Sequence, residues 1–183
     1  METILIVPGL HNSGPGHWQT WLENQLPHTR RVEQADWELP CLSEWAIRVS
    51  EAIVGEREPV WIVAHSFGCL ATVTAASVCG DRIRAALLVA PADPDRFDQS
   101  AALPDQRLDF PSLVIASSND PWVKSSVAES WAGIWGSHYR NIGDAGHINV
   151  ESGYGPWPEV LGFFQELRRD FLARQGALGL AQR

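Results

Sequence analysis

The chain has 183 residues, of which 45% are hydrophobic and 20% charged, a composition typical of an ordinary globular protein. Its length suits a single domain and is too short for two domains of typical size. The formal net charge of −8 argues against a nucleic-acid-binding surface, because such a surface needs an excess of basic residues.

The N-terminus and the cysteines indicate where the protein works. Met1 to Pro8 has no positively charged start and only a short apolar run, which argues against a secretory signal and a membrane span. The cysteines have neither metal-ligand spacing nor the even number that disulfides need; they are Cys41, Cys69 and Cys79. We therefore expect a cytoplasmic protein with free thiols, no membrane association, no metal site and no cofactor.

Strands and helices are predicted to alternate along the chain. Apolar runs predict buried strands, and a more polar run at residues 32–37 predicts an edge strand. In chain order, the predicted strands span residues 4–7, 32–37, 60–64, 85–90, 112–116 and 139–142. Apolar residues at helical spacing predict helices at residues 18–26, 42–53, 67–79, 127–135 and 160–171.

This alternation predicts parallel β-α-β units and a compact three-layer α/β fold, with about six mostly parallel strands and helices on both faces. Residues 1–174 are expected to form the single domain and residues 175–183 a flexible tail. The segment from Asp93 to Phe110 is the only place for a lid, and it is too short for a large cap domain. Ligands of such sheets bind beyond the carboxyl ends of the strands.

The stretch Ala64-His65-Ser66-Phe67-Gly68 carries the clearest chemical signal. It ends a buried strand and begins a helix of small residues, as the nucleophile turn of α/β hydrolases does. The turn needs small residues two positions before and two after the serine. Ala64 and Gly68 meet this need, although the usual first glycine is replaced. The alternative interpretation is a strand followed by an N-cap serine.

Candidate partners for Ser66 follow later strands. A serine hydroxyl needs a base that takes its proton and a third group that orients the base. Asp120 follows the fifth predicted strand and His147 the sixth, in the order Ser, Asp, His that α/β hydrolases use. Structural alternatives remain, with Asp120 as a turn residue and His147 as a surface histidine. Rival orienting groups are Asp93, Asp95 and, less strongly, Asp144.

Two backbone N–H groups are expected to stabilise the negative oxygen that forms on a substrate carbonyl. One belongs to Phe67, directly after the serine, and the other to the Pro8-Gly9-Leu10 loop after the first strand. Leu10 is favoured there, with His11 as the neighbouring alternative. Four aromatic side chains are candidates to line a substrate site, although core packing is the default role of the tryptophans; they are His11, Trp18, Trp122 and Trp157.

Four blocks of sequence resemble the RBBP9/YdeN family of small serine hydrolases. They are residues 9–21, 63–69, 117–121 and 145–149, and together they span nearly the whole chain. The resemblance implies a compact α/β-hydrolase fold, a Ser66–Asp120–His147 triad and esterase-like activity on small substrates. One member of the family binds the retinoblastoma protein through a motif whose acidic residue is missing from residues 39–43 here. We therefore expect no specific protein partner.

These observations predict a serine hydrolase, specifically a carboxylesterase that acts on small or short-acyl esters through an acyl-enzyme intermediate. A small-molecule ester is then the only expected partner. The alternative class is a non-enzymatic interaction protein that keeps the hydrolase fold. A flavodoxin-like nucleotide binder is disfavoured, because the chain has no glycine-rich phosphate loop.

Overall fold

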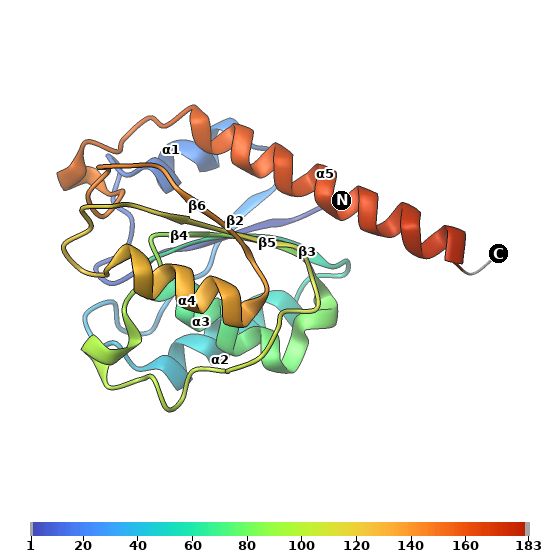
Figure 1. Ribbon diagram of the computed structural model, residues 1–183, viewed down its shortest axis with the longest axis horizontal. Helices are drawn as coiled ribbons and strands as arrows, with labels where there is room; N and C mark the ends of the chain where they lie inside the picture. The colour runs from blue at the N-terminus through green and yellow to red at the C-terminus, as the bar shows by residue number, and fades with distance from the viewer. Residues whose placement is uncertain (1, 182–183) are drawn as a thin grey trace.

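A computed structural model describes residues 2–181 and shows a twisted sheet between two layers of helices (Figure 1). The strands are all parallel and lie in the order β2-β1-β3-β4-β5-β6. They are β1 (Ile4–Val7), β2 (Thr29–Arg31), β3 (Val60–His65), β4 (Ile83–Val89), β5 (Ser112–Ala116) and β6 (His138–Asn141). The predicted three-layer α/β fold is therefore confirmed.

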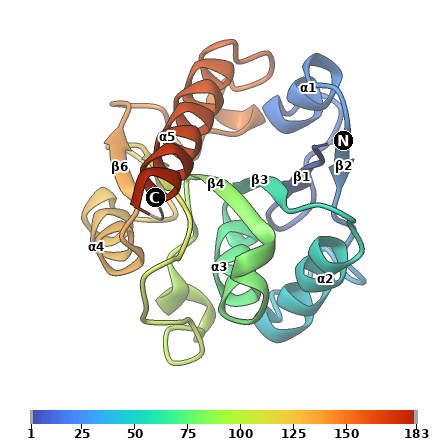
Figure 2. The ribbon, with the colours of Figure 1, turned by 90° about the vertical axis from the view of Figure 1, so that its right-hand side faces the viewer.

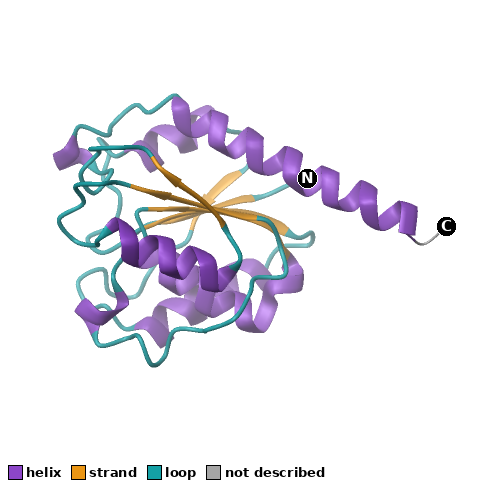
Figure 3. Ribbon diagram, viewed as in Figure 1, coloured by secondary structure: helices purple, strands orange, loops and turns teal. Residues whose placement is uncertain are grey.

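Helices cover both faces of the sheet (Figure 3). Helices α1 and α5 lie on one face, and α2, α3 and α4 lie on the other (Figure 2). Their bounds are α1 (Trp18–Gln25), α2 (Leu42–Val54), α3 (Phe67–Cys79), α4 (Ser125–Trp135) and α5 (Glu159–Ala181). Short 3-10 helices are η1 (Gly80–Arg82), η2 (Pro94–Phe97) and η3 (Val150–Ser152). The segment between β4 and β5 holds only η2, so residues 2–181 contain no large cap domain.

Two apolar cores flank the sheet, because successive strand residues point to opposite faces. Leu5 and Val7 of β1 pack in the core beneath α2, α3 and α4, whereas Ile4 and Ile6 pack beneath α1 and α5. Strands buried on both faces are continuously apolar in sequence. This is why β1, β3, β4 and β5 lie close to their predicted positions.

The strand order reverses between β1 and β3. From β1 the chain runs to the edge strand β2, and it then returns to place β3 on the other side of β1. The loops that leave the carboxyl ends of β1 and β3 therefore diverge, and such a point is where α/β sheets bind ligands. These two loops carry Gly9 and Leu10 on one side and Ser66 on the other.

The edge strand lies earlier in the chain than predicted. It comprises Thr29–Arg31, which pairs in parallel with residues 4–6 of β1, whereas residues 33–37 are irregular. The prediction of a strand at 32–37 is therefore wrong. An edge strand is paired on one side only and needs little apolar surface, so a polar triplet suffices. Val32, at the end of this pairing, is buried in the core and accounts for the apolar signal.

Helix α5 extends beyond the expected boundary at residue 174. It continues to Ala181, so residues 175–181 are helical where we expected a tail, and residues 182–183 lie outside the described part of the chain. Residues 172–177 are exposed, so they carry no apolar stripe from which a helix could have been predicted. Several of them are strong helix formers, which allows the helix to continue without packing.

Candidate active site

The turn after β3 holds Ser66 in a strained backbone conformation, with φ of 52° and ψ of −123°. This conformation projects the side chain from the carboxyl edge of the sheet. A Cβ atom on Gly68 would lie 2.3 Å from the Pro8 carbonyl oxygen and 2.5 Å from that of Val7, so only glycine permits this approach to β1. Ala64 is fully buried in β3, and its methyl group is accommodated where the usual pattern has glycine.

Ser66, His147 and Asp120 form a continuous row of hydrogen-bonded side chains. His147 Nε2 lies 2.9 Å from Ser66 Oγ, and His147 Nδ1 lies 2.8 Å from Asp120 Oδ2. The Asp120 side chain is fully buried, and its Oδ1 accepts a hydrogen bond of 2.8 Å from the Trp122 backbone N–H. Both carboxylate oxygens are thus engaged, which fixes the imidazole with Nε2 toward the serine.

The rival carboxylates are engaged elsewhere. Asp93 Oδ1 accepts a hydrogen bond of 3.1 Å from the Asp95 backbone N–H at the start of η2. Asp95 in turn accepts a hydrogen bond from the Ser100 hydroxyl. Asp144 is exposed. Asp120 is therefore the carboxylate that the fold brings to His147.

The backbone N–H groups around His147 are bound by side chains from other segments. The Ala145 N–H donates to Ser117 Oγ at 2.9 Å, and the Gly146 N–H donates to Asn119 Oδ1 at 2.7 Å. The His147 N–H itself donates to Ser152 Oγ at 3.1 Å. These acceptors come from the loop after β5 and from η3, so the His147 loop is held from both sides.

The carbonyl groups of the same loop are bound by two buried rings. His65 Nε2 donates to the His147 carbonyl oxygen at 3.0 Å, and Trp18 Nε1 donates to the Ile148 carbonyl oxygen at 2.8 Å. Burial, with smaller effects from His147 and His17, holds the pKa of His65 well below its usual range. His65 is therefore a neutral ring that ties the nucleophile turn directly to the loop of the base.

Two backbone N–H groups near Ser66 have no acceptor among residues 2–181, those of Leu10 and Phe67. Phe67 is the first residue of α3, where an N–H has no acceptor within the helix. In the part of the chain that the structure describes, the Leu10 N–H has no protein acceptor, whereas the His11 N–H donates to the Trp37 carbonyl oxygen at 3.0 Å. This geometry favours Leu10 over His11 as the second donor.

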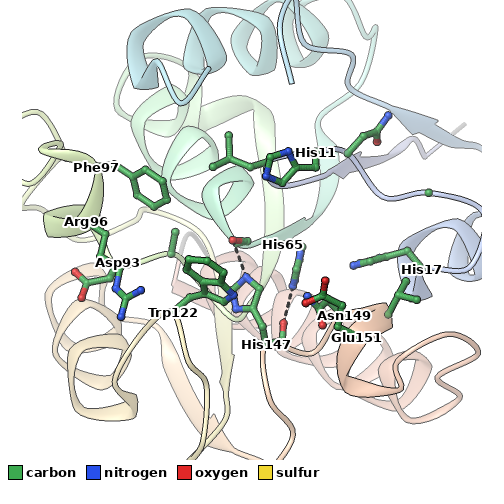
Figure 4. Close-up of a pocket in the computed structure, with 16 residues that line it drawn as sticks. His11, His17, His65, Asp93, Arg96, Phe97, Trp122, His147, Asn149 and Glu151 are labelled. Atoms are coloured by element: carbon green, nitrogen blue, oxygen red, sulfur yellow. Dashed lines mark hydrogen bonds between the residues drawn. The ribbon is translucent and has the colours of Figure 1, made fainter. Parts of the chain in front are cut away.

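A cavity of about 440 Å³ opens over this edge of the sheet (Figure 4). Of the predicted residues, Ser66, His147, Leu10, His11 and Trp122 line it. Trp122 is half exposed beside His147, with the two ring centroids 6.5 Å apart. His11 lies at the rim, where its Nδ1 pairs with Glu38 at 2.7 Å. The cavity thus places the Ser66 side chain within reach of a small ligand.

Trp18 and Trp157 do not line the cavity, and the expectation that they do is corrected here. Trp18 is fully buried, Trp157 is 6% exposed, and their rings pack edge to face in the core beneath α1 and α5. Trp18 instead supports the loop of the base through its bond to Ile148. The same apolar spacing that predicts a helix at Trp18 explains its burial, because the apolar side of an amphipathic helix faces the sheet.

Several cavity residues had no sequence signal of this role; they are Asn12, His65, Arg96, Phe97, Asn149 and Glu151. His65 directly precedes Ser66 in β3. Because side chains alternate along a strand, the sequence places His65 on the sheet face opposite Ala64, but it does not indicate the bond to the His147 carbonyl oxygen. His17 stands one residue before helix α1, where it is the N-cap. Only the packing of α1 against the loop after β6 brings it to the cavity.

A family model described as serine hydrolase matches residues 4–166. The chain belongs to this RBBP9/YdeN family. It is therefore an enzyme of the α/β-fold serine hydrolase class, as the four sequence blocks predicted. No curated protein matches the chain.

Solved structures of similar proteins share the fold, and one of them is similar enough to support the family. A YdeN-like hydrolase of Pectobacterium atrosepticum is 35% identical, with a TM-score of 0.88 over 93% of this chain and 92% of that chain. The YdeN protein of B. subtilis is 20% identical, with a TM-score of 0.76 over 92% of this chain and 100% of that chain. Est1E of Butyrivibrio proteoclasticus, solved with ferulic acid bound, shares the fold at 14% identity, with a TM-score of 0.69 over 97% and 90% of the two chains.

Two further features of the described residues bear on cofactors and membranes. Among residues 2–181, no three His, Cys, Asp or Glu side chains are grouped as a metal site would require. Within the same range, no helix combines the length and the apolar character needed to cross a bilayer.

Proposed function

We propose that this enzyme is a carboxylesterase that hydrolyses small or short-acyl esters through a Ser66–His147–Asp120 triad. The observation that carries the proposal is the row of hydrogen bonds from Ser66 Oγ through the imidazole to Asp120, at 2.9 and 2.8 Å. A row of this kind makes a serine hydroxyl nucleophilic at neutral pH. The oxyanion donors assigned to it are the Leu10 and Phe67 N–H groups.

In the first half of the reaction, Ser66 Oγ attacks the ester carbonyl carbon while its proton passes to His147 Nε2. The carbonyl oxygen becomes negative and accepts hydrogen bonds from the Leu10 and Phe67 N–H groups. The tetrahedral intermediate then collapses, the bond to the alcohol oxygen breaks, and His147 gives its proton to that oxygen. Asp120 stabilises the imidazolium throughout without taking its proton.

In the second half, a water molecule loses a proton to His147 Nε2 and attacks the acyl-enzyme carbonyl carbon. The new intermediate collapses, and the bond to Ser66 Oγ breaks. The serine takes back the proton from His147, and the carboxylic acid leaves. Each cycle consumes one ester and one water and restores the enzyme.

The preference for small substrates rests on the dimensions of the cavity. Its volume of about 440 Å³ lies toward the lower end of ligand pockets, which span roughly 300–1,000 Å³. The segment between β4 and β5 contributes only residues within 92–97 to its wall, and within residues 2–181 no cap domain extends the cavity for a long chain. A small-molecule ester is the proposed partner, and the free thiols of Cys41, Cys69 and Cys79 support a cytoplasmic location.

A fluorophosphonate probe tests the nucleophile. We expect the wild-type protein to be labelled covalently, Ser66→Ala not to be labelled, and His147→Ala to be labelled at least about 100-fold more slowly. Intact-mass spectrometry would measure the label. An unlabelled wild type, or equal labelling of Ser66→Ala, would refute the triad and favour a non-enzymatic protein that keeps the fold.

Hydrolysis of a short-chain p-nitrophenyl ester tests the orienting acid. Asp120→Asn is expected to lower kcat by about 10⁴-fold, because the amide stabilises the wrong imidazole tautomer. The matched control is Asp93→Asn, which alters a carboxylate that lines the cavity. A larger loss in the Asp93 variant would move the role to that residue.

A further inference from the structure

The cavity has two unlike walls, on either side of His147 (Figure 4). One wall consists of η2, its N-cap Asp93 and Trp122, with the Arg96 guanidinium 5.6 Å from the centre of the Trp122 ring and Phe97 beside them. The other wall consists of polar side chains; they are Asn12, His17, Asn149 and Glu151. The start of α1 and the loop after β6 pack together here, since the backbone N–H of Trp18 donates to the Tyr154 carbonyl oxygen at 3.2 Å.

His17 supplies a buried donor to this polar wall. It is only 5% exposed, and its Nδ1 caps helix α1 by accepting the Gln19 N–H at 3.1 Å. In a neutral imidazole with Nδ1 as acceptor, the proton resides on Nε2. Within residues 2–181 this Nε2–H has no protein acceptor, and Figure 4 shows the ring pointing from α1 into the cavity. Such a donor is complementary to an acceptor atom on a ligand.

The charge of His17 limits what it can bind. Burial, assisted by the nearby charges of Arg31 and His147, lowers its pKa to about 4. The ring is therefore an uncharged donor at neutral pH, and it offers no attraction to an anion beyond a hydrogen bond.

The neighbouring amides add donors, and Glu151 adds an acceptor. Asn12 Oδ1 already accepts the Ser13 N–H at 2.7 Å and Arg31 Nη1 at 3.0 Å. Asn149 Oδ1 accepts the Ser152 N–H at 3.1 Å. Neither amide NH₂ group has an acceptor within residues 2–181, so both remain as donors for a ligand. Neutral donors beside a carboxylate suit a group that both accepts and donates hydrogen bonds, which is the chemistry of a hydroxyl.

We infer that the polar wall is a subsite for the leaving alcohol and that the preferred substrates are esters of alcohols with further hydroxyl groups, such as 1,2-diols. The inference rests on the proposed esterase function. The alcohol is assigned to this wall because His147 must hand its proton to the leaving oxygen, and Asn149 and Glu151 continue the loop of His147. A hydroxyl of the alcohol accepts from His17 Nε2 and donates to Glu151.

Other chemistries fit the wall less well. A carboxylate or phosphate on the substrate would meet the Glu151 carboxylate, which repels it. An ammonium group would suit Glu151 but has no lone pair for the His17 donor, which would remain unpaired.

Matched esters test the subsite. The kcat/KM for 2,3-dihydroxypropyl butanoate is divided by that for propyl butanoate in each protein, so that the amount of active enzyme cancels. We expect the ratio to exceed about 3 in the wild type and to fall about 3- to 10-fold in His17→Asn, the effect of one hydrogen bond. Asparagine is a strong N-cap, so this variant keeps the start of α1. Glu151→Gln is a second variant with the same expectation, and His28→Asn, an exposed histidine far from the cavity, is the control.

Binding separates the subsite from the chemistry. Calorimetry of the two esters with Ser66→Ala, and with Ser66→Ala combined with His17→Asn, measures the same preference without turnover. If the wild type hydrolyses neither ester, the proposed function fails, and the binding preference alone decides the subsite. An equal affinity for both esters, an unchanged ratio in His17→Asn, or a greater gain from a hydroxyl on the acyl side, as in propyl 3-hydroxybutanoate, would overturn the inference. So would a stronger preference for a 2-aminoethyl ester.

Discussion

Neutral buried histidines distinguish the surroundings of Ser66 from an ordinary apolar core. The ring centroids of His17 and His65 lie 5.0 Å apart, and those of His65 and His147 lie 5.0 Å apart. Burial disfavours the charged form of the first two rings, so only His147, which faces the Asp120 carboxylate, has a partner for a positive charge. In the proposed mechanism, the imidazolium of His147 is thus spared like charges beside it.

The depressed pKa of His17 predicts a loss of stability in mild acid. In the unfolded chain His17 binds a proton as the pH falls through 6.5, whereas in the folded protein it does so only near 4. Between pH 7.5 and pH 5, His17 should therefore lower the free energy of unfolding by about 2 kcal/mol. Urea unfolding at both pH values measures this loss, and His17→Asn should lose about 2 kcal/mol less than the wild type. An equal loss in both proteins would contradict the prediction.

The loop of His147 depends on elements that are distant in sequence. Its peptide groups bond to side chains from α1, β3, η3 and the segment after β5. Ile148 in this loop has a φ of 48°, an unfavourable conformation for a β-branched residue. The surrounding bonds hold this strain in place, and the position of His147 depends on the packed elements together.

Two tryptophans allow the contribution of one of these bonds to be measured. Trp18 and Trp135 are both fully buried, but Trp18 Nε1 bonds to Ile148, whereas Trp135 Nε1 has no partner in the described part of the chain. Each change to phenylalanine removes similar volume, and only Trp18→Phe leaves a buried carbonyl unpaired. We expect Trp18→Phe to destabilise the protein by about 1–3 kcal/mol more than Trp135→Phe. Urea unfolding measures both, and equal losses would show that this bond adds little.

The whole molecule is a sheet closed on both faces, and α5 covers one of them along its length. Phe164 and Leu167 of α5 are buried against the sheet, and Phe171 packs edge to face on Trp61 of β3. Beyond that contact, residues 172–177 are exposed. The stabilising part of α5 therefore ends near residue 171, well before the helix does.

The domain boundary at residue 174 stays a prediction, and truncation of the chain tests it. Removal of residues 175–183 should change the free energy of unfolding by less than about 0.5 kcal/mol, as surface changes usually do. Removal of residues 165–183 should cost more than about 3 kcal/mol, because it exposes the core that Leu167 and Phe171 cover. Chemical denaturation of the two truncated proteins gives both values. A large loss in the shorter truncation would place the boundary beyond residue 174.

The sequence by itself determined the sheet, its parallel strands and the family. β1 and β3 are continuous apolar runs, and the pattern of α2 has a helical period, so local composition alone specifies them. The turn at Ser66, and Asp120 and His147 later in the chain, could also be predicted from the local sequence. They follow strand ends, and parallel strands bring such ends to one edge.

The tertiary structure alone decided which side chains from separate loops meet. The polar strand β2 was misplaced because its pairing with β1, not its own pattern, makes it a strand. Trp18 and Trp157 turned into the core, while His17 and Glu151 reached the cavity through the packing of α1 against the loop after β6. Contacts between residues more than a hundred positions apart, such as Trp18 with Ile148, have no local period in the sequence and arise only when the layers close.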